Sequence, residues 1–168
     1  MPFDPDKHRR RSIRLKGYDY SQPGAYFVTI NTYLDQKLFG DVVNGQIELN
    51  NYGHIVKREW LQTANIRGNI ELDTFVVMPD HFHGILVILE RGTERRAPTT
   101  EQFGKPTSGS LPTIVRYFKS GVTRQINKLR GADACPVWQR NYYEHIVRNE
   151  EELNRIREYI LGNPMKLQ

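Results

Sequence analysis

The chain is poor in cysteine, which limits the chemistry available to it. A single cysteine, Cys135, occurs among 168 residues, so a disulfide bond within the chain is excluded. One thiol without a partner is typical of proteins from reducing compartments. We therefore expect a cytoplasmic protein.

Long hydrophobic runs are also absent. The longest apolar run covers residues 85–89, far fewer than the roughly 20 residues of a membrane-spanning helix. No apolar segment follows the basic residues near the N-terminus, so we expect neither a signal peptide nor a membrane partner. The length and the 38% of hydrophobic residues predict one globular domain over residues 1–168, without internal repeats.

Charge is unevenly distributed along the chain, whose net charge is +5. Residues 1–16 carry six cations and two anions, and residues 91–168 carry fourteen cations and eight anions. Between them, residues 17–90 carry four cations and nine anions. Two basic blocks around an acidic one indicate that a polyanion binds part of the surface. A basic surface kept for solubility explains the same charges equally well.

Hydrophobic periodicity and turn signals predict a mixed fold. The expected elements are a strand at 24–33, a hairpin around Asn44-Gly45, a helix at 52–64 capped by Asn51, strands at 70–78 and 81–89, a helix at 112–130 stopped by Gly131 and open to interruption at Gly121, a strand at 137–147, and a helix at 150–163 capped by Asn149. Residues 1–16 are typical of a flexible basic arm, and residues 91–110 of a flexible loop. This order predicts an α+β, ferredoxin-like sandwich with a central, mainly antiparallel sheet and helices mainly on one face.

Two histidines lie one residue apart in the hydrophobic stretch "FVVMPDHFHGILVIL". On a strand, residues i and i+2 point the same way, so His81 and His83 share one face while Phe82 points to the other. From there both imidazoles can bind one divalent metal ion. A buried core histidine beside a surface histidine is the simpler explanation, so a metal site needs a third ligand and a chemistry.

The last predicted helix carries two polar residues on one flank of its hydrophobic stripe. Tyr159 and Asn163 are four residues apart and therefore neighbours one turn apart. The pattern alone makes Tyr159 a residue at the boundary of the stripe and Asn163 the C-cap of the helix.

Two stretches resemble one known family. "VVMPDHFHGILVI" resembles the HUH motif (His, bulky apolar residue, His) of the REP-associated tyrosine transposases. "YYEHIVRNEEELNRIREYILGNP" resembles the second signature of that family, in which the tyrosine before "xxxNP" is the nucleophile. "RSIRLKGYDYSQPGAYFVTI" is similar to the N-terminal segment of one branch. The resemblance covers nearly the whole chain apart from residues 91–110.

The resemblance implies a site and an activity. His81 and His83 match the metal-binding pair, Tyr159 matches the nucleophile, and Asn163 stands where the family has a third, amide ligand. The implied protein is a bacterial, nucleoid-associated, Mg²⁺- or Mn²⁺-dependent transesterase of the transposase type. It nicks and rejoins single-stranded, hairpin-bearing DNA through a 5′-phosphotyrosine intermediate. Whether it forms a homodimer is left open.

The basic residues of the second half are expected to contact DNA phosphates. These residues are Arg116, Lys119, Arg124, Lys128, Arg140 and Arg148. The neighbouring aromatic residues Tyr117, Phe118, Tyr142 and Tyr143 can stack on bases, although core packing is the simpler role for each.

Other interpretations remain open at this point. One is an HUH replication initiator or a relaxase-like nickase, although those enzymes usually have further domains. A second is a catalytically silent nucleic-acid-binding protein. A third is a structural zinc protein that uses His54, His81, His83 and Cys135, whose spacing matches no familiar zinc module. Tyr142 and Tyr143 are rival nucleophiles, on a predicted strand where packing explains them.

Overall fold

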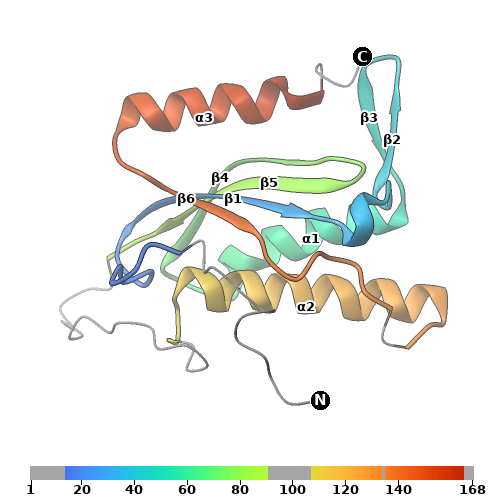
Figure 1. The fold of residues 1–168 in the computed structure, drawn as a ribbon, viewed down its shortest axis with the longest axis horizontal. Helices are drawn as coiled ribbons and strands as arrows, with labels where there is room; N and C mark the ends of the chain where they lie inside the picture. The colour runs from blue at the N-terminus through green and yellow to red at the C-terminus, as the bar shows by residue number, and fades with distance from the viewer. Residues whose placement is uncertain (1–13, 91–106, 134, 165–168) are drawn as a thin grey trace, which may run out of the picture.

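A four-stranded antiparallel sheet forms the centre of the molecule (Figure 1). The computed structural model describes residues 14–90, 107–133 and 135–164, so most of the predicted arm and loop lies outside the described residues. The strands, in the order in which they lie in the sheet, are β4 (Ile70–Val77), β5 (His81–Ile88), β1 (Gly24–Asn31) and β6 (Tyr143–Val147). With the chain alternating between strands and helices, this is the ferredoxin-like arrangement that the sequence predicts.

Two helices cover one face of the sheet and one helix covers the other (Figure 1). Helices α1 (Asn51–Asn65) and α2 (Leu111–Arg130) pack together on the first face, and α3 (Glu150–Gly162) lies alone on the second. The predicted α+β class with helices mainly on one face is therefore confirmed. No helix among the described residues is long and apolar enough to cross a membrane.

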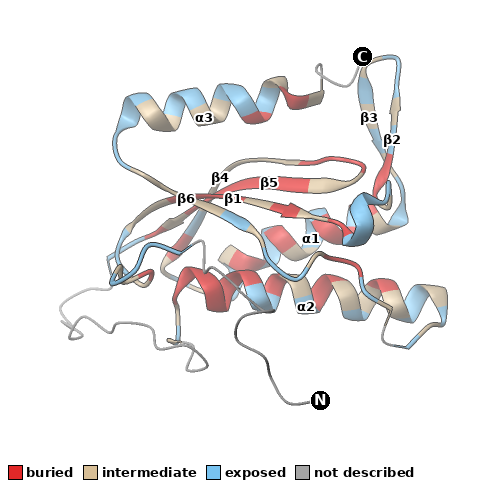
Figure 2. Cartoon of the chain, in the orientation of Figure 1, coloured by how far each residue is buried: buried red, intermediate tan, exposed pale blue. Residues whose placement is uncertain are grey.

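The main core lies between the sheet and the helix pair α1–α2 (Figure 2). Alternate residues of β1 point into it, and Tyr26, Val28 and Ile30 are fully buried. On β5, Phe82 packs against Trp60 of α1, with ring centroids 4.7 Å apart. A smaller core of Phe27, Ile85 and Ile160 lies between the sheet and α3. Burying both faces explains why β1 and β5 carry apolar residues on both faces and not on alternate positions alone.

Two short strands form a separate hairpin, β2 (Gly40–Val43) and β3 (Gln46–Leu49), around the predicted Asn44-Gly45 turn. Its base is tied to the turn before β5, because the backbone N–H groups of Leu38 and Phe39 both donate to the Pro79 carbonyl. The hairpin therefore stands beside the end of the sheet where β5 begins (Figure 1).

Most predicted ends shift by one or two residues, and three features differ in a way that has a clear physical reason. The N-cap of α1 is Asn50, not Asn51, because the Asn50 side chain accepts from two N–H groups of the first turn. Helix α2 continues through Gly121, where a Cβ atom would collide with the Glu59 carboxylate of α1. The predicted strand at 137–147 is shorter, because its first part forms only an isolated bridge between Trp138 and Thr32.

Candidate active site

The two histidines lie side by side on the face of the sheet that α3 covers. The pairing of β1 with β5 sets Thr29 opposite His83 and Asn31 opposite His81. The imidazole centroids of His81 and His83 are 4.6 Å apart. His83 is buried, with 3% of its surface exposed, whereas His81 is partly exposed. Solvent therefore reaches the pair mainly at His81.

Each imidazole is held through its Nδ1 atom. The Nδ1 atom of His83 is 2.8 Å from the Thr29 hydroxyl, and that of His81 is 2.5 Å from an Asp80 carboxylate oxygen. The Nε2 atom of His83 is buried and has no hydrogen-bond partner among the described residues. When Nδ1 donates to Thr29, Nε2 presents its lone pair, as in histidines that bind a metal.

The protonation state of His83 fits the same role. Burial, reinforced by the nearby His81, lowers the pKa of His83 to about 4. The ring is therefore neutral near pH 7, and a metal ion requires a neutral imidazole. A buried imidazole nitrogen without a hydrogen-bond partner lowers the stability of the fold, so its presence here favours a role in binding a ligand.

The Tyr159 ring of α3 lies against the His83 imidazole. Its ring centroid is 5.4 Å from that of His83 and 6.1 Å from that of Phe27. Ile160, the next residue, is fully buried against Phe27 and Ile85 and anchors the helix there. Tyr159 itself is 44% exposed, so a large substrate can reach it from solvent. The structure thus brings together three of the four residues predicted to carry the chemistry.

Asn163 follows one turn later as the C-cap of α3. It is 8% exposed, and its Nδ2 atom is buried without a hydrogen-bond partner in the part of the chain that the structure describes. A half-turn of the amide exchanges its nitrogen and oxygen, so the side chain can offer an oxygen to an ion. This end of α3 and the start of β5 lie at the same end of the molecule (Figure 1).

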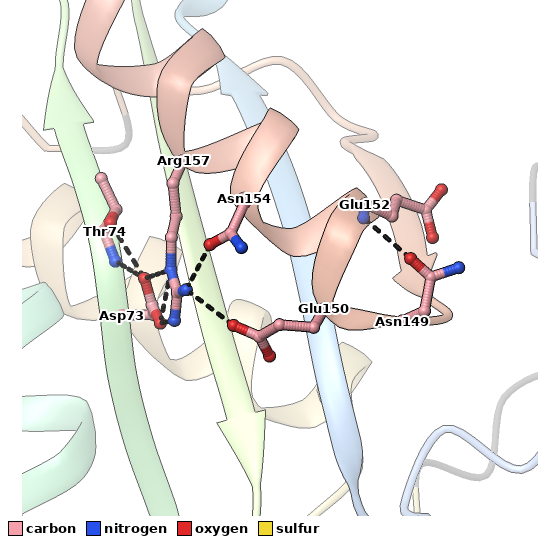
Figure 3. A network of polar contacts seen from close by, with 7 residues as sticks. All are labelled: Asp73, Thr74, Asn149, Glu150, Glu152, Asn154 and Arg157. Carbon is pink, nitrogen blue, oxygen red and sulfur yellow. Dashed lines mark hydrogen bonds and ion pairs between the residues drawn. The ribbon is translucent and has the colours of Figure 1, made fainter.

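An ion pair docks α3 on the outer strand β4 (Figure 3). The Arg157 guanidinium donates to both carboxylate oxygens of Asp73, at 3.0 Å from Nε to Oδ1 and 2.6 Å from Nη2 to Oδ2. Asp73 lies where the pairing of β4 with β5 shifts register, and it also accepts from the N–H and hydroxyl of Thr74. Because Arg157 is two residues before Tyr159, this bidentate pair helps to set the position of the helix.

A second contact docks the first turn of α3 on β6. The Asn149 side chain caps the helix by accepting from the Glu152 N–H at 2.8 Å (Figure 3). The Glu152 carboxylate in turn accepts from the Arg148 N–H and lies 2.7 Å from the His145 Nε2 atom. These two contacts, the backbone one foremost, lower the pKa of Glu152. His145 therefore has a structural role, because its contact with Glu152 docks α3 on β6.

The Asp73–Arg157 pair makes stability depend on acid pH. The Arg157 hydrogen bonds hold the pKa of Asp73 to about 2, below its ordinary 3.8. The stabilisation is therefore present above pH 4 and is lost as the pH falls through 2. In urea unfolding at pH 7, the free energy of unfolding of Asp73→Asn should be about 1 to 2 kcal/mol lower than that of the parent, after allowance for solvent screening. The deficit should shrink towards pH 2, and exposed Glu150→Gln should change stability little. A deficit independent of pH would contradict this role.

The residues predicted to bind DNA do not form one surface. Lys119, Arg124 and Arg140 line a single open groove. Arg116 and Lys128 are exposed on α2, and Arg148 is exposed before α3. Helix α2 lies on the face opposite to the histidine pair (Figure 1). The Lys119 Nζ atom donates to the Gln139 carbonyl at 2.7 Å, and burial lowers its pKa to about 8.

The other aromatic residues separate into core and surface. Phe118 is buried, and Tyr142 packs against the main core, whereas Tyr117 is exposed. Tyr143 is 52% exposed and lies opposite Thr29 on the histidine face, with its ring 6.3 Å from Phe27. Packing therefore explains Tyr142 but not Tyr143, which stays a rival to Tyr159.

Three contributors to the site are not among the residues that the sequence singles out. Thr29, Asp80 and Phe27 hold or flank the two imidazoles. Only Asp80, adjacent to His81, carries a local signal. Among the described residues, no three His, Cys, Asp or Glu side chains cluster as a metal site, so nothing in the structure supports the zinc interpretation.

Comparison with known proteins finds relatives in sequence and in fold. No family model matches the chain. An uncharacterised protein of Haemophilus influenzae is 42% identical over 163 residues, covering 94% of this chain and 89% of its own length. A second Haemophilus influenzae protein, named "Putative REP-associated tyrosine transposase", is 26% identical over 148 residues, covering 88% of this chain and 74% of its own.

The fold has a match among solved structures. A REP-associated tyrosine transposase bound to a REP hairpin superposes with a TM-score of 0.61 at 20% identity, covering 93% of this chain and 74% of that one. At this identity the match concerns the fold. The chain is therefore similar in sequence to a protein named as a REP-associated tyrosine transposase, and it shares its fold with a solved member of that family.

Proposed function

We propose that the chain is a metal-dependent single-strand DNA transesterase that nicks and rejoins hairpin-bearing DNA through a 5′-phosphotyrosine intermediate. The observation that carries the proposal is the half-exposed Tyr159 ring, 5.4 Å from His83, whose Nε2 atom is buried and unpartnered. The relative in the solved structure is bound to a REP hairpin, which supports a DNA hairpin as the feature by which the protein recognises its substrate.

The residues fit a divalent ion. His81 and His83 would hold it through their Nε2 atoms, with the Asn163 amide as a third ligand. When bound, Mg²⁺ or Mn²⁺ supplies charge stabilisation at the phosphate and orients it. Three neutral ligands leave the charge of the ion uncompensated, which favours a phosphate oxygen beside them.

The chemistry at Tyr159 is one exchange of phosphodiester bonds. The phenol Oη atom forms a bond to the phosphorus while the bond from phosphorus to the 3′ oxygen breaks. The proton lost from Oη passes to solvent, which reaches this half-exposed residue, and the leaving 3′ oxygen gains a proton. The phenol needs this help because its ordinary pKa is near 10. Attack on the phosphotyrosine by another 3′-hydroxyl reverses the step, so no nucleotide cofactor is needed.

The neighbouring residues position the histidines. Thr29 and Asp80 hold the Nδ1 atoms at 2.8 and 2.5 Å and so set both ring orientations. Phe27 stacks on His83, with centroids 5.6 Å apart. It excludes water from that side of the ring.

An end-label assay tests the proposal. Single strands bearing a hairpin, taken from the flanks of the gene, are labelled at the 5′ or the 3′ end and incubated with protein and Mg²⁺ or Mn²⁺. A 5′ label should appear on a shortened strand ending in a 3′-hydroxyl. A 3′ label should migrate with the protein. Binding without cleavage under all metal conditions would instead favour a catalytically silent DNA-binding protein.

A further inference from the structure

An open groove runs between the second half of α2 and the segment that precedes β6. Its wall includes three basic side chains, two hydroxyls and an indole: Lys119, Arg124, Arg140, Ser120, Thr123 and Trp138. None of the described residues that line it is acidic. Basic side chains and hydroxyls of this kind complement phosphate oxygens.

The segment that forms one wall of the groove pairs with the end of β1, which lies beside His81 on β5. Trp138 forms a bridge with Thr32, and the Gln139 N–H donates to the Asn31 carbonyl at 2.9 Å. Asn31 is in turn the residue opposite His81. One wall of the groove is therefore joined by backbone hydrogen bonds to the strand ends at the candidate active site.

A strained turn lies between the groove and the site. Tyr33–Asp35 forms a short 3-10 turn directly after β1. Leu34 and Asp35 have positive φ values of 56° and 53°, which non-glycine residues adopt at a cost and which often accompany function. A hydrogen bond of 2.8 Å from Gln139 to the Asp35 carboxylate holds the turn.

The turn exposes apolar side chains where a nucleic acid would pass. Tyr33 is 42% exposed and Leu34 is 68% exposed. Base stacking on exposed aromatic groups, next to a basic groove, is how proteins bind single strands. A paired helix hides the faces of its bases, so this arrangement suits an unpaired segment better than the hairpin stem.

We propose that the groove and the Tyr33–Asp35 turn bind the unpaired DNA segment that adjoins the scissile phosphate. Arg124 and Arg140 contact its phosphates, and Tyr33 stacks on a base as the strand leaves the groove for the histidine pair. This inference rests on the proposed function for the identity of the ligand. What the inference adds is the position of the unpaired DNA segment on the protein surface.

Binding is measured by fluorescence anisotropy with a labelled unpaired oligonucleotide, in chelator and in the Tyr159→Phe background, so that cleavage plays no part. Arg124→Gln/Arg140→Gln should reduce the slope of log affinity against log salt by about 1.4, equivalent to roughly 25-fold weaker binding near 0.1 M salt. The control Lys16→Gln/Lys57→Gln removes the same charge from exposed sites outside the groove. An equal loss in both double variants, or no loss in the groove variant, overturns the proposal.

Photo-crosslinking locates the strand independently. An oligonucleotide carrying 5-iododeoxyuridine in the unpaired segment should crosslink to Tyr33, and Tyr33→Ala should lose that crosslink while keeping its affinity for a blunt hairpin. Crosslinks only to residues outside the turn and the groove overturn the proposal. A protein that passes both tests yet never cleaves DNA contradicts the proposed function alone, and one that cleaves but fails them contradicts only this path.

Discussion

Tyr159→Phe is expected to bind hairpin-bearing single strands as the parent does and to form no covalent adduct and no 3′-hydroxyl product. The change removes one hydroxyl from a half-exposed residue and keeps the ring that contacts His83 and Phe27. Stability should therefore change by at most about 1 kcal/mol, a single hydrogen bond's worth. Denaturing gels of the protein with end-labelled DNA measure the adduct, and thermal unfolding checks the fold.

The rival tyrosines supply matched controls. Tyr143→Phe removes the same group from a half-exposed ring on the same face, and Tyr142→Phe removes it from a ring packed against the core. Both variants should still form adduct. If adduct persists in Tyr159→Phe and disappears in Tyr143→Phe, the nucleophile is Tyr143 and the assignment from the second signature is wrong.

His83→Ala is expected to abolish cleavage at every Mg²⁺ or Mn²⁺ concentration while single-strand binding survives. The change removes the buried Nε2 atom that has no partner among the described residues, together with the ring on which Tyr159 lies. His81→Ala should behave in the same way, and excess chelator should reproduce both losses in the parent. Cleavage rates across a metal titration measure the effect.

Thr29→Val separates ligation from orientation. It preserves the shape of the side chain and removes the 2.8 Å contact with the Nδ1 atom of His83. Partners of this kind typically contribute about 10- to 100-fold in metal affinity or activity. Thr29→Val should therefore cleave more slowly than the parent, and a high metal concentration should restore part of the rate.

Full cleavage by His83→Ala, or by the parent in chelator, would show that no metal bound by these histidines is needed.

Local sequence patterns predict most of the fold, because its elements carry strong local signals. The period-two pattern of β1, the Asn44-Gly45 turn and the Gly131 stop each depend on a few adjacent residues, and the structure has all three. The alternation on β5 also places both imidazoles on one face, as the 4.6 Å separation shows.

Contacts between distant segments could not be predicted in this way. Thr29 meets His83 only through the register of β1 with β5, across 54 residues. Arg157 meets Asp73 across 84 residues, at a register shift that no local pattern marks. The face on which α3 packs follows from these contacts and from the burial of Ile160.

The position of the basic residues shows the same limit. Their number indicates a polyanion, but tertiary structure separates them. Arg124 and Arg140 share a groove although 16 positions apart, whereas Arg116 is not among the residues that line it. The number of basic residues therefore indicates the charge of a ligand, whereas only the fold shows which of these residues can contact it together.

The central claim is that Tyr159 becomes covalently attached to a 5′ phosphate of single-stranded DNA. The most direct measurement is incubation of the full chain with hairpin-bearing single strands and Mn²⁺, followed by nuclease trimming and mass spectrometry of the peptides. The account predicts one modified peptide, with a nucleotide phosphate on Tyr159 and no modification on Tyr142 or Tyr143. Cleaved DNA with a free 5′ phosphate and no modified tyrosine would contradict it.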